Sequence, residues 1–258
     1  MRADLLLVVR GLAASRTLAR RAIEAGRVSV ILDSRREPVR QPAQSLPENA
    51  ELEVLADPGE RYVSRGGIKL AGALTHTHLD VSGFVCLDVG QSTGGFSDCL
   101  LQAGAARVVG VEVGHGQLHA RLRGEPRLVC LEGINARDLT QADLGAHWPE
   151  GGFGLIVVDA SFISLTLLLP RLPALMSIGG HLLALVKPQF EVGPGNLGKG
   201  GIVRDARLYD GVEARIRAAC ETGGLTVADW FDSPITGGDG NREFFVHCRF
   251  GRPVEGRP

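Results

Sequence analysis

The stretch FVCLDVGQSTGGF, residues 84–96, decides the fold class. Residues 84–89 are apolar apart from Asp88, which predicts a short buried strand. A glycine-rich turn follows, and a helix is predicted over residues 94–102. Glycines let a backbone approach a ligand closely, and the first turn of a helix offers free N–H groups. The stretch therefore predicts a strand, a ligand-binding turn and a helix, although a tight structural turn would also explain the glycines.

Strands and helices alternate along the chain from about residue 66. Apolar runs predict further strands at residues 107–113, 128–131, 154–159, 181–186, 225–231 and 243–250. Helices are predicted at residues 165–176 and 206–222. This alternation favours an α/β fold, in which a mostly parallel sheet carries helices on both faces.

The beginning of the chain has a different composition. The first 40 residues carry nine arginines and four acidic residues, whereas residues 41–60 carry five acidic residues and no basic one. The predicted elements here are helices at 4–10 and 13–25 and strands at 28–32 and 51–55. Ser15 is the expected N-cap of the second helix. The change in composition predicts a small separate basic domain.

The second predicted helix presents arginines on one side. Arg16, Arg20 and Arg27 lie near one face of the helix and its exit. The residues predicted to point inward are Leu18, Ala22 and Ile23. A basic helix face beside a small sheet can hold the phosphates of RNA or DNA without reading bases. An ordinary solvated charged face is the alternative.

Charged residues end several of the predicted strands, namely Glu112, Asp159 and Lys187. Ligands of such sheets bind outside the carboxyl ends of the strands, so these side chains would open onto one crevice. Glu112 could take both hydroxyls of a ribose. The turn lacks the glycine spacing of a dinucleotide fingerprint and the lysine of a phosphate loop. This combination favours S-adenosylmethionine as ligand, although each charge alone could form an ordinary surface salt bridge.

Lysine is scarce in this chain. Only three of the 28 lysine and arginine residues are lysines, namely Lys69, Lys187 and Lys199. Genome composition can explain the excess of arginine. A lysine, however, supplies a compact amine that the planar arginine fork cannot replace. The three lysines are therefore candidate functional residues.

Six stretches together resemble the hemolysin-named TlyA family of ribosomal-RNA methyltransferases: residues 64–70, 88–96, 159–164, 187–191, 198–205 and 233–245. The catalytic domain of that family is similar to the FtsJ type of 2′-O-methyltransferase. The resemblance implies a Rossmann-like, S-adenosylmethionine-dependent methyltransferase fold with a mostly parallel seven-stranded sheet and a small N-terminal α+β domain. The implied division is an RNA-binding domain like that of ribosomal protein S-four over 1–58, a linker over 59–65, the methyltransferase domain over 66–252 and a flexible tail over 253–258.

The resemblance also implies functional residues. A catalytic Lys-Asp-Lys-Glu tetrad would consist of Lys69, Asp159, Lys187 and Glu243, gathered around the methyl group of the cofactor, with Lys187 holding or deprotonating the substrate hydroxyl. The S-adenosylmethionine contacts would be Asp88, Gly90, Ser92, Gly94, Gly95, Phe96, Glu112, Val113, Asn135, Ala136 and Asp159. RNA would be bound by Arg16, Arg20, Arg27, Arg65 and Lys199. No metal is expected.

The activity implied is 2′-O-methylation of a ribose, that of a cytidine, in ribosomal RNA of ribosomal subunits. A non-catalytic RNA-binding assembly factor and a membrane-lytic hemolysin are the alternatives. A base-directed amino methyltransferase is disfavoured, because the sequence has no Asn/Asp-Pro-Pro-Tyr-like motif.

Three departures from the family pattern stand out. Gln91 replaces a small residue, Asp239 replaces a basic or neutral one, and residues 28–33 lack the usual Val-Asn-Gly turn. The last two bear on RNA affinity and target range.

Charge and hydropathy restrict the remaining possibilities. The formal net charge is −1, so any nucleic-acid binding depends on a local patch. No apolar run approaches the roughly 20 residues that span a bilayer, and no secretory signal is recognisable. We therefore expect a cytoplasmic protein without membrane insertion. Five dispersed cysteines predict reduced thiols.

Overall fold

The computed structural model describes residues 1–13, 15–32, 35–55 and 61–251, which form two compact units divided between Arg61 and Tyr62. Residues 59 and 60 of the expected linker over 59–65 lie outside the described residues. Tyr62 is buried, and the Val63 N–H donates a hydrogen bond of 2.8 Å to Asp98 Oδ2, so this segment packs as part of the second unit. The expected tail at 253–258 lies outside the described residues.

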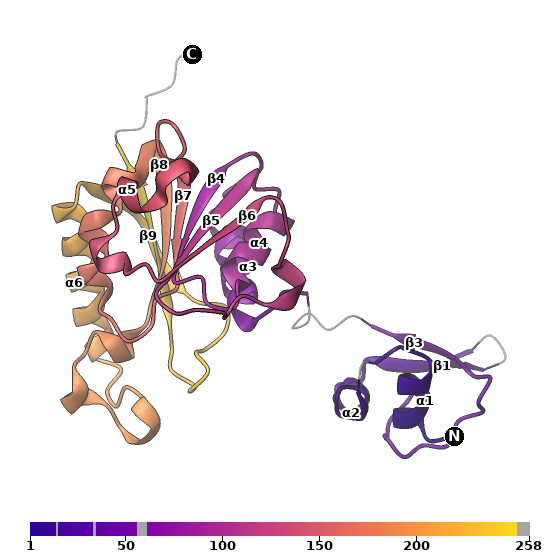
Figure 1. The fold of residues 1–258 in the computed structure, drawn as a ribbon. Coiled ribbons are helices and arrows are strands. Elements are labelled where there is room, and N and C mark those ends of the chain that lie inside the picture. The colour runs from indigo at the N-terminus through magenta and orange to yellow at the C-terminus, as the bar shows by residue number, and fades with distance from the viewer. Residues whose placement is uncertain (14, 33–34, 56–60, 252–258) are drawn as a thin grey trace, which may run out of the picture. The chain divides into compact units, whose positions relative to one another are not determined.

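The first unit packs two helices against a small antiparallel sheet (Figure 1). Its elements are α1 (Ala3–Val9), α2 (Arg16–Glu24), β1 (Val28–Leu32), β2 (Arg35–Pro38) and β3 (Glu51–Val54), in the sheet order β2-β1-β3. Ser15 caps α2 by accepting a hydrogen bond from the Leu18 N–H. The prediction that Leu18 points inward is wrong, because its side chain is exposed and Ala19 is buried instead. Strand β2 was not predicted, since its four residues are all exposed.

The second unit contains a seven-stranded sheet in the order β6-β5-β4-β7-β8-β10-β9 (Figure 1). The strands are β4 (Val85–Val89), β5 (Arg107–Glu112), β6 (Leu128–Glu132), β7 (Phe153–Val158), β8 (Met176–Val186), β9 (Leu225–Asp232) and β10 (Phe244–Phe250). Strands β4 to β8 run parallel to one another, and β10 runs antiparallel to both β8 and β9. The predicted mostly parallel α/β sheet is confirmed.

Helices cover both faces of this sheet. The α-helices are α3 (Arg65–Thr77), α4 (Gly95–Gln102), α5 (Gln141–Leu144) and α6 (Leu208–Thr222). Short 3-10 turns are Ala120–Leu122, Ala136–Asp138, Gly145–His147, Leu165–Leu167, Leu169–Arg171, Pro173–Leu175, Pro188–Phe190, Pro194–Asn196 and Lys199–Gly201. Residues of α3 and α4 belong to one buried cluster and residues of α6 to the other, so the sheet separates two cores.

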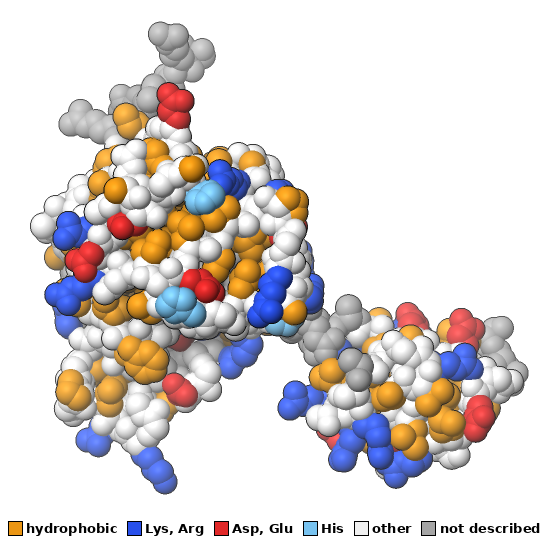
Figure 2. Space-filling view, viewed as in Figure 1, with side chains coloured by type: hydrophobic (Ala, Val, Ile, Leu, Met, Phe, Trp, Pro, Cys, Tyr) orange, Lys and Arg blue, Asp and Glu red, His pale blue; other side chains and the backbone are white. Residues whose placement is uncertain are grey.

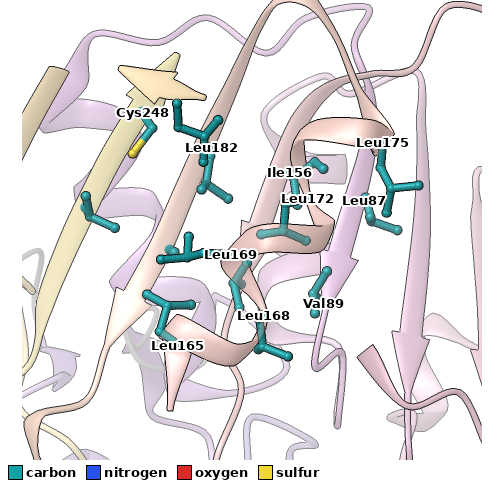
Figure 3. Packing of buried hydrophobic residues seen from close by; sticks show 14 of the residues in the cluster. Leu87, Val89, Ile156, Leu165, Leu168, Leu169, Leu172, Leu175, Leu182 and Cys248 are labelled. Carbon is teal, nitrogen blue, oxygen red and sulfur yellow. The ribbon is translucent and has the colours of Figure 1, made fainter. Parts of the chain in front are cut away.

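The predicted helix at 165–176 is wrong. The structure has three successive 3-10 turns there, because Pro170 and Pro173 lack the N–H that a continuous helix needs. Most leucines of this stretch are nevertheless buried in the hydrophobic core. Figure 3 shows the leucines of these turns lying over the sheet side chains Leu87, Ile156 and Leu182.

No helix within the described residues is long and apolar enough to cross a membrane.

Candidate active site

Strand alternation brings three ionisable side chains to one face of the sheet, and a helix adds a fourth. Val157, Leu185 and Phe245 point into the core on the α3 and α4 side. Successive strand residues point to opposite faces, so the positions two residues away lie on that same face. Those positions are Asp159, Lys187 and Glu243, and α3 adds Lys69 from above.

The register of the strands places two of these groups side by side. Phe244 pairs with Val186 in the antiparallel β8–β10 ladder, so the next step along the ladder brings Glu243 beside Lys187. On α3, a Cβ at Gly66 would lie 3.7 Å from Asp159 Oδ2. Lys69 follows Gly66 by three residues and shares its helix face. The tetrad predicted from sequence thus meets at the carboxyl end of the parallel strands, and the amines of Lys69 and Lys187 face the same side of the sheet.

The four groups form two close ion pairs. Lys69 Nζ lies 2.6 Å from Glu243 Oε2, and both side chains are nearly buried. Lys187 Nζ lies 2.7 Å from Asp159 Oδ1 and also donates a hydrogen bond of 2.8 Å to Ser161 Oγ. Apart from these lysine contacts, no described residue donates a hydrogen bond to Asp159 Oδ1 or Glu243 Oε2. Each lysine amine is therefore fixed by a carboxylate that retains capacity to accept a further hydrogen bond.

Two cavities meet at Asp159. The larger, of about 470 Å³, is lined by Gly90, Ser92, Glu112, Val113, Asn135 and Ala136 among the predicted cofactor contacts. The smaller, of about 160 Å³, is lined by Lys187 together with Gly66, Gly95 and Phe96. Gly90, Ser92, Asp159 and Ser161 line both cavities. A ligand in the larger cavity would therefore lie next to the Lys187 amine.

The glycine turn shapes the larger cavity. Gly90 has φ +82°, and a Cβ there would lie 2.7 Å from the carbonyl oxygen of Asp159. Only glycine fits this close approach of two backbones. Glu112 fixes the loops around it, because Oε2 accepts the Ser92 N–H at 2.9 Å and Oε1 accepts the Gly114 N–H at 2.8 Å.

Two predicted cofactor contacts lie outside both cavities. Asp88 is fully buried, and its Oδ2 accepts a hydrogen bond of 2.6 Å from Ser97 Oγ. Burial raises the pKa of Asp88 to about 7. Gly94 instead caps α4 with φ +89°, and a Cβ there would clash with Leu122. The predicted roles of Asp88 and Gly94 as direct contacts are corrected: both support the turn from behind.

The unusual Gln91 belongs to the same support. Its side-chain amide donates a hydrogen bond of 2.7 Å to Ser97 Oγ and fills the space above Gly110 on β5. The sequence reasoning missed Gln117, which lines the larger cavity and whose Oε1 accepts a hydrogen bond of 3.0 Å from Ser92 Oγ. No motif distinguishes Gln117, because only the folding of its loop brings it to the cavity.

The predicted RNA-binding arginines of the first unit have protein partners of their own. Arg16 Nη2 lies 3.1 Å from Asp4 Oδ2, and Arg20 lies 3.8 Å from Glu24. Hydrogen bonds from Arg2 and Arg16 lower the pKa of the buried Asp4 to about 2. Figure 2 shows that basic side chains gather over the helical side of this unit. The side chains of Arg16 and Arg20 remain more than half exposed, so an ion pair within the protein does not prevent either of them from contacting RNA.

The other predicted RNA-binding residues differ in their surroundings. Arg27 Nη1 approaches the Leu55 carbonyl oxygen at 3.4 Å. Arg65 donates a hydrogen bond of 2.8 Å to the Thr236 carbonyl oxygen. Lys199 is exposed on a 3-10 turn that Asn241 anchors by donating to the Gly201 carbonyl oxygen at 3.0 Å.

The described part of the chain holds no cluster of three or more His, Cys, Asp or Glu side chains suited to a metal ion. All five cysteines are free thiols.

Comparison with known proteins agrees with this geometry. Residues 62–250 match the FtsJ-like methyltransferase family. The 16S/23S rRNA (cytidine-2′-O)-methyltransferase TlyA of Mycobacterium tuberculosis (strain CDC 1551 / Oshkosh) is 45% identical over 249 residues, which cover 96% of this chain and 89% of that protein.

Solved structures give the same result. A hemolysin-named protein from Streptococcus thermophilus has 38% sequence identity and a TM-score of 0.71, covering 97% of this chain and 88% of that chain. An S-adenosylmethionine-dependent methyltransferase from Mesorhizobium loti, at 16% identity and a TM-score of 0.53 over 69% of this chain and 96% of that chain, shares the fold. With its matched domain and these relatives, the chain belongs to the FtsJ-like methyltransferase family.

Proposed function

We propose that this protein transfers a methyl group from S-adenosylmethionine to the ribose 2′-hydroxyl of a cytidine in ribosomal RNA. The observation that carries the proposal is the position of the Lys187 amine, which lines the cavity that adjoins the larger, cofactor-sized one. The relative from Mycobacterium tuberculosis, at 45% identity, has this activity in its name.

The larger cavity fits S-adenosylmethionine chemically. A cavity of about 470 Å³ is within the range of cofactor sites. Glu112 at one end is suited to ribose hydroxyls, while Asn135 and Ala136 would flank the adenine. Asp159 lines this cavity as well, so its carboxylate could accept a hydrogen bond from the ammonium group of the cofactor. Bound there, the cofactor supplies a methyl group on a positively charged sulfur.

The tetrad would orient the substrate and manage its proton. Lys187 Nζ contacts the 2′-hydroxyl and holds its oxygen in line with the methyl carbon, an alignment that can lower a barrier by up to ~7–11 kcal/mol. When the hydroxyl oxygen takes the methyl group and the electron pair of the broken S–C bond remains on the sulfur, the hydroxyl proton would pass to the Lys187 amine and from there to solvent. Lys69 and Glu243, paired at 2.6 Å, support the neighbouring wall of the site.

The first unit would bind the RNA by shape and phosphate contacts. Folded RNA displays its phosphates and 2′-hydroxyls along shallow grooves, and a splayed nucleotide can enter a catalytic cavity. With Arg16, Arg20 and Arg27 on one unit and Arg65 and Lys199 on the other, the chain would contact RNA at two places and gain avidity.

The test is transfer of tritiated methyl groups to purified ribosomal subunits, followed by mass spectrometry of the RNA nucleosides. Wild-type protein should give 2′-O-methylcytidine. Lys187→Ala and Lys187→Arg should each lose at least ~100-fold in rate, because alanine has no amine and arginine is larger and does not release its proton. Both variants should still bind S-adenosylmethionine in calorimetry.

A control substitution is Arg217→Ala, which changes a half-buried residue of α6 whose ion-pair partner, Glu213, lies on the same helix. Methylation by Lys187→Ala near the wild-type rate would remove Lys187 from the mechanism. RNA binding without any methyl transfer by the wild-type protein would favour a non-catalytic assembly factor.

A further inference from the structure

A second groove lies on the opposite face of the sheet from the tetrad. It has a volume of about 270 Å³ and lies between α6 and the β9–β10 pair. Its walls include Tyr209, Trp230, Arg242 and Phe244, and the carboxylates of Asp210 and Asp232 line it as well. The methyl-transfer mechanism proposed above uses none of these residues.

The groove begins one residue away from the tetrad. Glu243 points to the α3 side of the sheet, where it pairs with Lys69. The residues before and after it, Arg242 and Phe244, line the groove on the α6 side. The beginning of β10 therefore separates the groove from the Lys69–Glu243 pair. A strand of RNA lying across it would reach both.

Arg242 forms a fixed cationic surface over aromatic rings. Its Nε and Nη2 lie 2.6 and 2.8 Å from the two carboxylate oxygens of Asp232. Its Cζ lies 4.9 Å from the centre of the Phe244 ring and 5.7 Å from that of Tyr209. The side chain is still 53% exposed, so part of the guanidinium faces solvent.

Trp230 extends this stack. Its ring lies 5.4 Å from that of Phe244 with an interplanar angle of 27°. Trp230 is only half-buried, so part of its surface is open to the groove. Unpaired bases in RNA bind to such surfaces, stacking on aromatic rings and on arginine planes.

The charges of the groove select the part of a nucleotide that can enter. Carboxylates repel phosphate but accept hydrogen bonds from the exocyclic amino groups of bases. Phosphates would be bound outside the groove, near the segment that carries Lys199. Asn241 Oδ1 accepts a hydrogen bond of 3.1 Å from the Val203 N–H, which holds this segment against the loop that leads into Arg242. The chemistry therefore fits a planar, amino-bearing ring rather than an anion.

We propose that the groove is a stacking site for an unpaired nucleobase that flanks the methylated nucleotide in the RNA. The inference rests on the proposed function for the identity of the RNA, and its test is separate from methyl transfer.

The first test uses tryptophan fluorescence. The chain has two tryptophans, and Trp148, which packs edge-on against Phe153 at the start of β7, does not line the groove. In the Trp148→Phe variant, Trp230 is the sole reporter. An unstructured RNA of ten nucleotides should quench its fluorescence, whereas the same backbone with abasic riboses should not.

The second test separates stacking from charge. Arg242→Ala and Trp230→Ala should each weaken the binding of this RNA about tenfold or more, the scale expected for loss of one base stack. Trp230→Phe should restore binding, because it keeps an aromatic face. Arg242→Lys should not, because it keeps the charge and loses the plane. Asp232→Asn controls for loss of the Arg242 ion pair, and affinity for S-adenosylmethionine should not change in any variant.

Three results would overturn the proposal: no quenching at saturating RNA, equal quenching by the abasic backbone, or quenching only by an arginine-rich peptide, which would make the groove a protein-docking site. Methylation assays on ribosomal subunits keep the two proposals distinct. Methyl transfer without quenching refutes the groove alone, and quenching without methyl transfer refutes the proposed function while base binding stands.

Discussion

At the scale of single residues, the site depends on backbone contacts that permit only one side chain. Gly90 is the clearest case, because the carbonyl oxygen of Asp159 occupies the space where any Cβ would be. The turn that lines the larger cavity therefore contacts the backbone of Asp159 directly, and a change in one would displace the other.

Replacing Gly90 tests this connection. Gly90→Ala should weaken S-adenosylmethionine binding by at least ~tenfold in calorimetry, since the loop must move away from Asp159 to relieve the overlap. The matched control is Gly224→Ala, whose φ of +80° imposes the same backbone cost but whose Cβ would meet no atom within 4 Å. Equal affinities in the two variants would contradict the argument.

Ser161 has a positioning role at the same scale. Its hydroxyl accepts a hydrogen bond from Lys187 Nζ, and it lines both cavities. Because hydrogen bonds to charged groups contribute about 1.5–3 kcal/mol, Ser161→Ala should lower kcat roughly 10- to 100-fold. Ser161→Thr, which keeps the hydroxyl, should recover most of the rate. Steady-state kinetics would decide, and a change confined to KM would instead indicate a binding role.

At the scale of elements, the antiparallel β8–β10 pair carries two neighbouring histidines, of which His247 is buried and His181 is half-buried. His181 Nδ1 and His247 Nε2 lie 2.9 Å apart, and burial lowers the pKa of His247 to about 4. The charges of His181 and Arg249 lower it further, while Asp229 opposes them. The same strand pair positions Glu243 beside Lys187.

The sign of that dependence follows from proton uptake. Unfolded histidine titrates near pH 6.5, so between about pH 6.5 and 4 the unfolded chain binds a proton that the folded chain excludes. The free energy of unfolding should therefore fall as pH drops through this window, by up to about 3 kcal/mol from His247. Urea unfolding at several pH values should show a shallower loss in His247→Gln, whereas His115→Gln, an exposed control, should follow the wild type.

At the scale of the whole molecule, the two units have separate hydrophobic cores. The first unit buries residues such as Leu6, Leu7 and Ile23, and the second surrounds its sheet with two clusters of its own. The family match also begins at residue 62. The second unit should thus fold and bind cofactor without the first.

Deleting residues 1–61 tests the division of labour. The remaining chain should keep its affinity for S-adenosylmethionine, because both cavities lie within it. Its affinity for ribosomal subunits should fall at least ~tenfold with the loss of the basic helical surface. Calorimetry and filter binding measure the two quantities separately, and unchanged methylation of subunits would argue against a role for the first unit in RNA binding.

Local sequence patterns predicted most of the elements and the residues at the strand ends. Apolar runs mark the strands, and the charged residues that follow them, such as Glu112, Asp159 and Lys187, lie where a parallel sheet binds ligands. The joint presence of Lys69 and Glu243 in the tetrad came from the family resemblance, since no local pattern connects residues 174 positions apart.

Only the tertiary structure decided which of these residues meet. It pairs Lys69 with Glu243 and Lys187 with Asp159, buries Asp88 behind the turn, brings Gln117 to the larger cavity and breaks residues 165–175 into turns. The physical reason is one of range. Periodicity and turn chemistry act over a few neighbouring residues, whereas partners across the sheet depend on strand order and on the packing of α3 and α6 against opposite faces.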